Sequence, residues 1–314
     1  MSYFLLIVGF ILLITAANWL VDGASGLAKR LNIPDLIIGL TIVAFGTSAP
    51  ELMVNIVAAI KGSSEIALTN VLGSNTINTL VILGVTALIY PIASQKSCRL
   101  VDIPFSIVAG IAVLCLCTDY FTTSNGVLSR WDGIILLCFF ALFMAHIIYL
   151  GIKGNASIDE NYKPMKLWVS LVLIFVGLAG LMIGGNLIVD NAVKIAIAWN
   201  VRESVIGVTI VALGTSLPEL ATSAIAAKKK NADIAIGNII GSNIFNIFFV
   251  LGISAVIRPL PTYPNFLLDV AVVIISSLLI LIFTHNKQYT IKRWHGAVLL
   301  AVYAIYLYFL LSNL

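Results

Sequence analysis

The stretch Ile38–Leu52, IGLTIVAFGTSAPEL, returns 168 residues further along the chain as Ile206–Leu220, IGVTIVALGTSLPEL. Twelve of the fifteen positions are identical, which chance does not produce over such a length. Each copy places a glutamate, Glu51 or Glu219, directly after a proline and inside an apolar run. The chain is therefore predicted to contain two related halves, each contributing the same polar cluster to a hydrophobic protein.

A second motif repeats at the same spacing. GSNTIN at Gly73–Asn78 matches GSNIFN at Gly241–Asn246. Three more residues near the end of the first predicted helix have identical counterparts in the second half: Asn18, Val21 and Asp22 match Asn186, Val189 and Asp190. The two aspartates lie near the predicted ends of their helices, where an exposed or capping role competes with ion binding.

The composition is that of a membrane protein. Of the 314 residues, 60% are hydrophobic and only 10% are charged, with a mean hydropathy of +1.07, whereas soluble domains are about a quarter charged. Because a spanning helix needs about 20 mostly apolar residues, we predict an all-α integral membrane protein with ten transmembrane helices. They span residues 3–25, 36–60, 66–90, 101–118, 131–151, 167–190, 204–227, 234–257, 266–284 and 294–312.

Residue types that commonly hold cofactors are scarce. The four cysteines show no CxxC spacing and have no histidine nearby, so we expect them to pack within helices rather than bind zinc. The formal charge of +4 does not require a nucleic-acid partner. We expect no cofactor and no obligate protein partner. The lipid bilayer is the only surrounding partner that the sequence implies.

The distribution of lysine and arginine predicts the orientation in the membrane. One set of alternating loops, which includes Lys228–Lys230, carries thirteen of these residues, and the other set, which includes Lys61, carries five. Because cytoplasmic loops are enriched in positive charge, the first set is assigned to the cytoplasm. The protein is thus expected in the cell (inner) membrane, with several passes and both termini extracellular or periplasmic.

An odd number of helices per half predicts an inverted repeat. Residues 1–150 hold five predicted helices, residues 151–166 form a cytoplasmic linker, and residues 167–314 hold five more. The second half must therefore enter the membrane from the opposite side. Many secondary transporters have this plan, with the binding site near the midplane where the repeats meet.

The motif AFGTSAPE at Ala44–Glu51 has the chemistry of a cation site. Pro50 lacks an N–H, and its ring presses on the carbonyl four residues earlier, so the helix is expected to break near Gly46. Such a break is tolerated in a membrane only inside protein or against water. Freed carbonyls, the hydroxyls of Thr47 and Ser48 and the carboxylate of Glu51 are oxygen ligands, which Na⁺ and Ca²⁺ prefer.

The second motif adds further oxygen ligands. Ser74 and Asn78 are four residues apart and share one helix face, as do Ser242 and Asn246. Small and polar residues in membrane helices also mediate packing between helices, which is the competing interpretation for these four. The glutamates are stronger evidence, because an intramembrane carboxylate is costly and marks a functional site by default.

In these motifs the chain resembles a known family, the sodium/calcium exchangers of the calcium/cation antiporter superfamily. The two repeat signatures of that family, G-T-S-x-P-E and G-S-N-x-x-[ND], appear here as GTSAPE and GTSLPE, then as GSNTIN and GSNIFN. The resemblance implies a prokaryotic type of exchanger, since the chain has no large cytoplasmic loop.

By position, the resemblance implies roles for the residues of the first motif. Glu51 and Glu219 match carboxylates that bind Ca²⁺ and also neutralise Na⁺. Thr47 and Thr215 match residues whose backbone carbonyls bind Ca²⁺. Four serines match hydroxyl ligands of Na⁺ sites: Ser48, Ser216, Ser74 and Ser242.

The remaining matched positions are neutral. Ala44 and Ala212 match carbonyl ligands of the outer Na⁺ sites, and Asn78 and Asn246 match the central pair. Some exchangers carry Asp where Asn246 stands, so this chain departs from them. Two glutamates balance one Ca²⁺, whereas three Na⁺ would leave an excess charge of +1. The driving ion is therefore open between Na⁺ and H⁺.

These expectations favour a secondary active antiporter that exchanges Ca²⁺ for Na⁺ by alternating access at one shared midplane site. The alternatives are an H⁺/Ca²⁺ exchanger and, from another class, a passive cation channel, which the broken helices would also permit. Inverted repeats favour alternating access over a pore. Hydrolysis by Ser48 or Ser216 lacks a base in the same motif, so no enzyme is expected.

Overall fold

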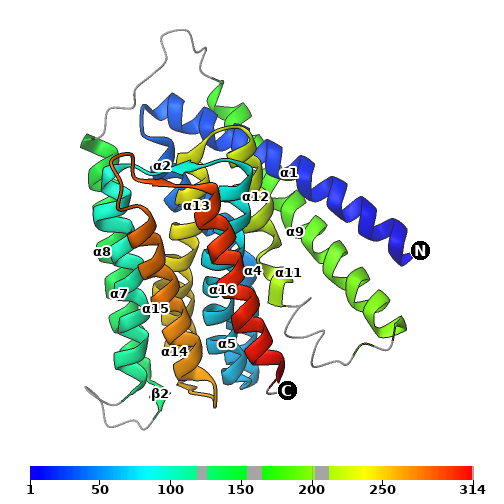
Figure 1. Cartoon of the computed structure of the whole chain (residues 1–314), viewed down its shortest axis with the longest axis vertical. Helices are drawn as coiled ribbons and strands as arrows, with labels where there is room; N and C mark the ends of the chain where they lie inside the picture. The colour runs from blue at the N-terminus through cyan, green and yellow to red at the C-terminus, as the bar shows by residue number, and fades with distance from the viewer. Residues whose placement is uncertain (119–125, 154–164, 200, 202–211, 313–314) are drawn as a thin grey trace.

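The computed structural model describes residues 1–118, 126–153, 165–199, 201 and 212–312, and these are mostly helical (Figure 1). Within this part of the chain, eight helices are long and apolar enough to cross a membrane. The bent pair Asp35–Thr47 and Ala49–Lys61, counted as one span, raises the number to nine. The predicted span 204–227 falls partly outside the described residues.

The helices follow the order that the hydrophobic runs predict. Those of the first half are α1 (Ser2–Leu31), α2 (Asp35–Ile38), η1 (Gly39–Val43), α3 (Ala44–Thr47), α4 (Ala49–Lys61), α5 (Ser64–Thr76), η2 (Ile77–Ile82), α6 (Leu83–Ile89), η3 (Cys98–Asp102), α7 (Ile103–Cys117) and α8 (Arg130–Lys153). Those of the second half are α9 (Leu167–Ala198), α11 (Ala212–Thr215), α12 (Leu217–Lys228), α13 (Ala232–Ile244), η5 (Phe245–Leu251), α14 (Gly252–Ile257), α15 (Phe266–Phe283) and α16 (Arg293–Ser312).

Two helices are longer than predicted. α1 continues to Leu31 and α9 to Ala198, where the apolar runs predict ends at residues 25 and 190. Backbone hydrogen bonding persists beyond the apolar run, which hydropathy alone does not reveal. A 30-residue helix such as α1 is about 45 Å long, longer than the hydrocarbon core of about 30 Å. Both helices are tilted against the rest of the bundle (Figure 1).

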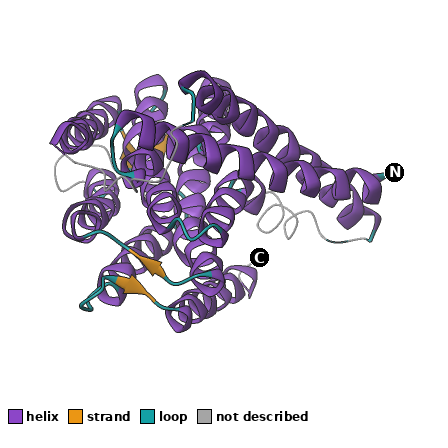
Figure 2. Ribbon diagram, turned by 90° about the horizontal axis from the view of Figure 1, so that it is seen from above, coloured by secondary structure: helices purple, strands orange, loops and turns teal. Residues whose placement is uncertain are grey.

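The described residues are mostly helical, as the all-α prediction has it, but they also contain four two-residue strands that the sequence analysis did not predict. β1 (Ile92–Ala93) pairs antiparallel with β4 (Thr290–Ile291), and β2 (Val127–Leu128) pairs with β3 (Leu260–Pro261) (Figure 2). The strands are too short to show the alternating pattern by which strands are recognised. β1 follows α6 and β3 follows α14, and each pairs with a strand that lies between two helices of the other half.

The centre of the bundle is formed by helices that are buried on all sides. Every residue from Ile234 to Ile244 of α13 is buried, as is most of the segment from Ala67 to Leu83 in α5 and η2. A helix enclosed on all sides belongs to the interior of a protein. The polar residues of the second motif, which lie on these segments, are therefore held inside the molecule.

The tilted helices α1 and α9 pack against each other along their length and lie at one side of the bundle (Figures 1 and 2). Their contact depends on glycines. A Cβ at Gly184 would lie 2.9 Å from the backbone nitrogen of Leu13, and one at Gly177 would lie 2.8 Å from that of Leu20. Small residues allow such close backbone approach in membranes, so the two helices are expected to move as a unit.

We expect Gly184→Ala to destabilise the protein and Gly185→Ala to leave its stability unchanged or raise it. The new methyl at 184 would press on the backbone of α1, whereas at Gly185 the nearest atom is 3.9 Å away, in Pro218. Alanine is otherwise favoured over glycine in helices by about 1 kcal/mol. Melting temperatures in detergent measure both effects, and equal melting temperatures would contradict the contact.

An apolar cavity of about 550 Å³ separates part of α9 from the bundle. Its walls include Leu178 and Met182 from α9, Phe45 from α3 and Phe245 from η5. The cavity is open to the surface, since Phe45 is half exposed. The α1–α9 pair therefore meets this side of the bundle along an open apolar groove.

Candidate cation-binding site

Both copies of the first motif interrupt a helix. The structure breaks the first helix at Ser48, two residues beyond the expected position, with a bend of 45° between its two parts. Ser216 has nearly the same backbone angles, φ −88° and ψ 5°. Pro50 and Pro218 follow in the first turn of the next helix, where a missing N–H has no cost. The break therefore comes from the proline, as the sequence predicts.

The two glutamates lie fully inside the protein and exchange hydrogen bonds between the halves. Glu51 is 1% exposed and Glu219 is not exposed. Ser48 donates to Glu219 Oε1 at 3.0 Å, and Ser216 donates to Glu51 Oε1 at 3.4 Å. Ser74 donates to the same oxygen of Glu51, also at 3.4 Å. Each broken helix thus contributes a serine to the carboxylate of the other half.

Several buried polar atoms around these carboxylates have no hydrogen-bond partner. They are Glu51 Oε2, Glu219 Oε2, Thr215 Oγ1, Ser242 Oγ, Asn246 Oδ1 and both polar atoms of the Asn78 side chain. Unsatisfied buried groups are rare in proteins and usually indicate a missing ion, water or function. All but one of these atoms are oxygens, which suit a hard cation.

The Thr47 side chain belongs to a hydrogen-bond network that the sequence analysis did not include. Its hydroxyl donates to Asn238 Oδ1 at 3.0 Å. Asn238 in turn donates to the backbone oxygen of Glu219 at 3.3 Å and to Ser223 Oγ at 2.9 Å. In the first half Asn70 donates to Asn55 Oδ1 at 2.7 Å. Asn70 and Asn238 are identical residues at the repeat offset, and this signal could have identified them.

A second network joins the two central helices. Asn75 donates to the backbone oxygen of Asn243 at 3.0 Å, and Asn243 donates to Thr79 Oγ1 at 2.8 Å. Asn246 donates to Asn75 Oδ1 at 3.2 Å. Asn75 and Asn243 belong to the repeated GSN motif, but the sequence analysis assigned them no role. Their bonds hold the two central helices together and so position the serines beside them.

Both predicted central asparagines lie at π-helical turns. Asn78 is the second residue of η2, and Asn246 is the second residue of η5. π-Helical turns are uncommon and frequently mark functional sites. Ala44, one of the two outer positions, differs from the rest of the set. Its carbonyl already accepts a bond from Ser48 N at 3.0 Å, and the Thr47 hydroxyl lies 3.3 Å from it as an alternative donor.

The charge of the site comes from two carboxylates. No group of three or more His, Cys, Asp or Glu that could hold a metal occurs in the described part of the chain. The candidate site therefore combines two formal negative charges with neutral hydroxyl, amide and carbonyl oxygens. This set fits a transported hard cation better than a tightly held transition metal.

Comparison with known proteins agrees with this chemistry. The chain matches the sequence profile of the sodium/calcium exchanger protein family over residues 1–149 and 169–312. The chain belongs to the sodium/calcium exchanger family. It is accordingly a multi-pass membrane protein of an antiporter family, and the resemblance seen in the two repeated motifs is confirmed.

Full-length relatives and solved structures extend this match. The chain is 38% identical to the putative antiporter CaxA of Alkalimonas amylolytica, covering 98% of both proteins. It is 31% identical to the sodium/calcium exchanger MaX1 of Methanosarcina acetivorans, covering 98% of this chain and 97% of that protein. The crystal structure of the exchanger NCX_Mj soaked with Na⁺ and Sr²⁺ matches with a TM-score of 0.82 and 35% identity, over 98% of this chain and 97% of that chain.

Proposed function

We propose that this family member exchanges Ca²⁺ for Na⁺ across the cell (inner) membrane through one shared site. The observation that carries the proposal is the exchange of serine–glutamate hydrogen bonds between the two broken helices, Ser48 to Glu219 and Ser216 to Glu51. It brings two buried carboxylates into one cluster with unsatisfied oxygens. Na⁺ and Ca²⁺ would compete for these oxygens, and this competition makes exchange obligatory.

The proposed ligands are those that the motif positions imply. Ca²⁺ would bind Glu51, Glu219 and the backbone carbonyls of Thr47 and Thr215. The Na⁺ sites would use hydroxyls of Ser48, Ser216, Ser74 and Ser242 and the carbonyls of Ala44 and Ala212, with Asn78 and Asn246 at the centre. The unsatisfied side-chain atoms of Ser242, Asn78 and Asn246 support the assignment of these three residues.

We further propose that residues 1–150 and 167–314 form inverted repeats joined by the linker 151–166, and that α1 and α9 move together to alternate access. Three observations support this. The broken helices of the two halves exchange contacts, the small sheets join connections of opposite halves, and an apolar cavity lies between α9 and the bundle. Inverted repeats commonly work by one unit moving against the other around a fixed site.

The burial of both carboxylates also explains why exchange would be coupled. Two bare carboxylates are costly to enclose without compensating charge. The rearrangement is therefore expected to be easy only when bound cations neutralise Glu51 and Glu219. Passive leakage through an ion-free, occluded site should be correspondingly slow.

H⁺/Ca²⁺ exchange is the second candidate, and the neutral Asn78 and Asn246 favour it. With two glutamates as the ionised ligands, one Ca²⁺ or two H⁺ balance the site, whereas three Na⁺ do not. Uptake of ⁴⁵Ca²⁺ into proteoliposomes under imposed Na⁺ or H⁺ gradients separates the candidates. Uptake driven by a Na⁺ gradient at equal pH supports the proposal, and uptake driven only by a pH gradient supports the rival. Channel-like rates would reject both.

The predicted orientation has a direct test. On a background in which the four cysteines are replaced by alanine, Lys228→Cys should react with impermeant thiol reagents only from the cytoplasm. Lys61→Cys, in the equivalent loop of the first half, should react only from outside. Both side chains are exposed. Labelling of right-side-out and inside-out vesicles gives the result, and reaction of both cysteines from one side would reject the inverted arrangement.

A further inference from the structure

We propose that Lys229–Asp22 and Lys61–Asp190 are a matched pair of ion-pair latches, each closed in one of the two access states. This inference rests on the proposed alternating access. The first pair holds α1 against the loop between α12 and α13. The second pair, on the symmetry-related loop and helix, is open in this structure and should close when the first opens.

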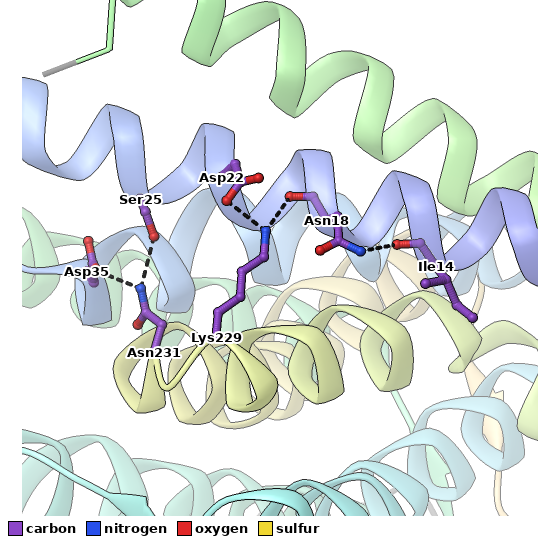
Figure 3. Close-up of polar contacts among 7 residues, drawn as sticks. All are labelled: Ile14, Asn18, Asp22, Ser25, Asp35, Lys229 and Asn231. Carbon is purple, nitrogen blue, oxygen red and sulfur yellow. Dashed lines mark hydrogen bonds and ion pairs between the residues drawn. The ribbon is translucent and has the colours of Figure 1, made fainter.

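The closed latch is visible between α1 and the loop after α12 (Figure 3). Lys229 Nζ lies 2.7 Å from Asp22 Oδ1 and donates to the backbone oxygen of Asn18 at 3.2 Å. Two residues further on, Asn231 donates to Ser25 Oγ at 2.9 Å and to Asp35 Oδ2 at 2.6 Å. These bonds tie the last turns of α1 to the loop that leads into α13.

The sequence repeat supplies the partners of the second latch. At the repeat offset, Lys61 corresponds to Lys229 and Asp190 corresponds to Asp22. The loop geometry also corresponds, since Gly62 has φ 85° and its counterpart Lys230 has φ 60°. Both turns therefore use a left-handed residue directly after the lysine, and both lysines project from the same point of the same kind of turn.

The second latch is open here. Lys61 and Asp190 are both exposed and both described, and the ion pair found among the described residues is that of Lys229 with Asp22. The C-terminal end of α9 stands away from α4 and α5 (Figure 1). If each half adopts the conformation of the other, the Asp22–Lys229 contact is replaced by its counterpart, Asp190–Lys61.

The two latches are unequal. Asn231 binds Ser25 in the closed latch, but the counterparts at the repeat offset are Ser63 and Val193, and valine has no side-chain hydrogen-bonding group. The state seen here therefore has one polar contact that the other state lacks. We expect it to be the more populated state when no ion gradient is imposed.

Cross-linking tests the proposal. On the cysteine-free background, one variant carries Asp22→Cys with Lys229→Cys and another carries Lys61→Cys with Asp190→Cys. A short bifunctional thiol reagent should link the first pair at rest and the second pair mainly during Ca²⁺ exchange. Each cross-link should stop ⁴⁵Ca²⁺ flux, and reduction should restore it. The mixed pair Asp22→Cys with Lys61→Cys, on opposite sides of the membrane, should not cross-link.

Charge removal gives a second measurement. Adding Lys229→Gln to the second cysteine pair should raise its cross-linking rate about two- to five-fold, the scale of one partly exposed ion pair. Adding Lys61→Gln to the first pair should raise that rate less than about twofold, because the state that this pair cross-links is already the more populated one. Lys228→Gln, a neighbouring exposed lysine, should change neither.

The outcomes separate this inference from the proposed function. If the cysteine-free protein exchanges Ca²⁺ but the second pair does not cross-link during flux, the latch proposal is wrong and the proposed function stands. Full flux through a cross-linked protein would reject the latch in the same way. If the cysteine-free protein moves no Ca²⁺ although the unmodified protein does, the cysteine pairs are introduced into the unmodified protein instead. If the unmodified protein itself moves no Ca²⁺ under any gradient, the proposed function is wrong and the latch proposal falls with it.

Discussion

Replacing Glu51 or Glu219 by glutamine is expected to abolish Ca²⁺ transport while leaving a folded protein. Both side chains are buried and each keeps an oxygen that can accept the serine bond of the other half. Glutamine has nearly the same shape but no charge. At an effective dielectric constant of about 20, a unit charge 4 Å from a divalent ion contributes on the order of 8 kcal/mol, partly offset by desolvation.

The expected loss of Ca²⁺ affinity is therefore at least about 100-fold, or more than about 2.7 kcal/mol. Na⁺ binding should weaken less, because a monovalent ion feels half the attraction. Isothermal titration with Ca²⁺ and ⁴⁵Ca²⁺ flux measure the effect, and the melting temperature confirms folding. Glu51→Asp, which keeps the charge but shortens the side chain, is the matched control and should retain part of the activity. Unchanged uptake in a folded glutamine variant would remove that glutamate from the mechanism.

Converting Asn78 or Asn246 to aspartate is expected to make Ca²⁺ transport more dependent on pH than in the unmodified protein. Both asparagines are buried, and each has at least one polar atom without a partner. An ionised aspartate would add a third negative charge to Glu51 and Glu219. One bound Ca²⁺ would then leave the site negative, while three Na⁺ would be balanced.

At acid pH a proton on the new carboxyl restores the original charge, so the variants should resemble the unmodified protein there. As the pH rises and the proton leaves, the dependence on Na⁺ should steepen and Ca²⁺ flux should diverge. The divergence should reach at most about tenfold per pH unit, the limit for one proton. Flux driven by Na⁺, measured against pH for the unmodified protein and both variants, provides the comparison. Three superimposable profiles would mean that neither asparagine faces the ions.

Much of the fold could be predicted because its signals are local. Long apolar runs identify spans by length and composition, and nine of the ten predicted spans have counterparts among the described residues. A proline in the interior of a helical run removes a backbone hydrogen bond and kinks or breaks the helix, so the interruptions before Glu51 and Glu219 could be expected from sequence. The four short strands could not be predicted, because two-residue strands depend on a partner far along the chain.

The candidate site could likewise be predicted only in part from the sequence. Repetition identifies Glu51, Glu219 and the serines, and it could also have identified Asn70 and Asn238. It cannot say that Ser48 donates to Glu219 rather than to Glu51. That pairing spans 171 residues, and depends on how two broken helices cross inside the membrane.

By itself, the sequence determined that this protein spans a membrane, that its halves repeat, and that each half carries one buried carboxylate beside a broken helix. These properties follow from composition, periodicity and the backbone chemistry of proline. The tertiary structure alone decided which oxygens are left without partners, which serine serves which glutamate, and that Lys229 rather than Lys61 holds an aspartate in this state. Such choices depend on contacts between distant segments, which local composition and the repeated motifs do not specify.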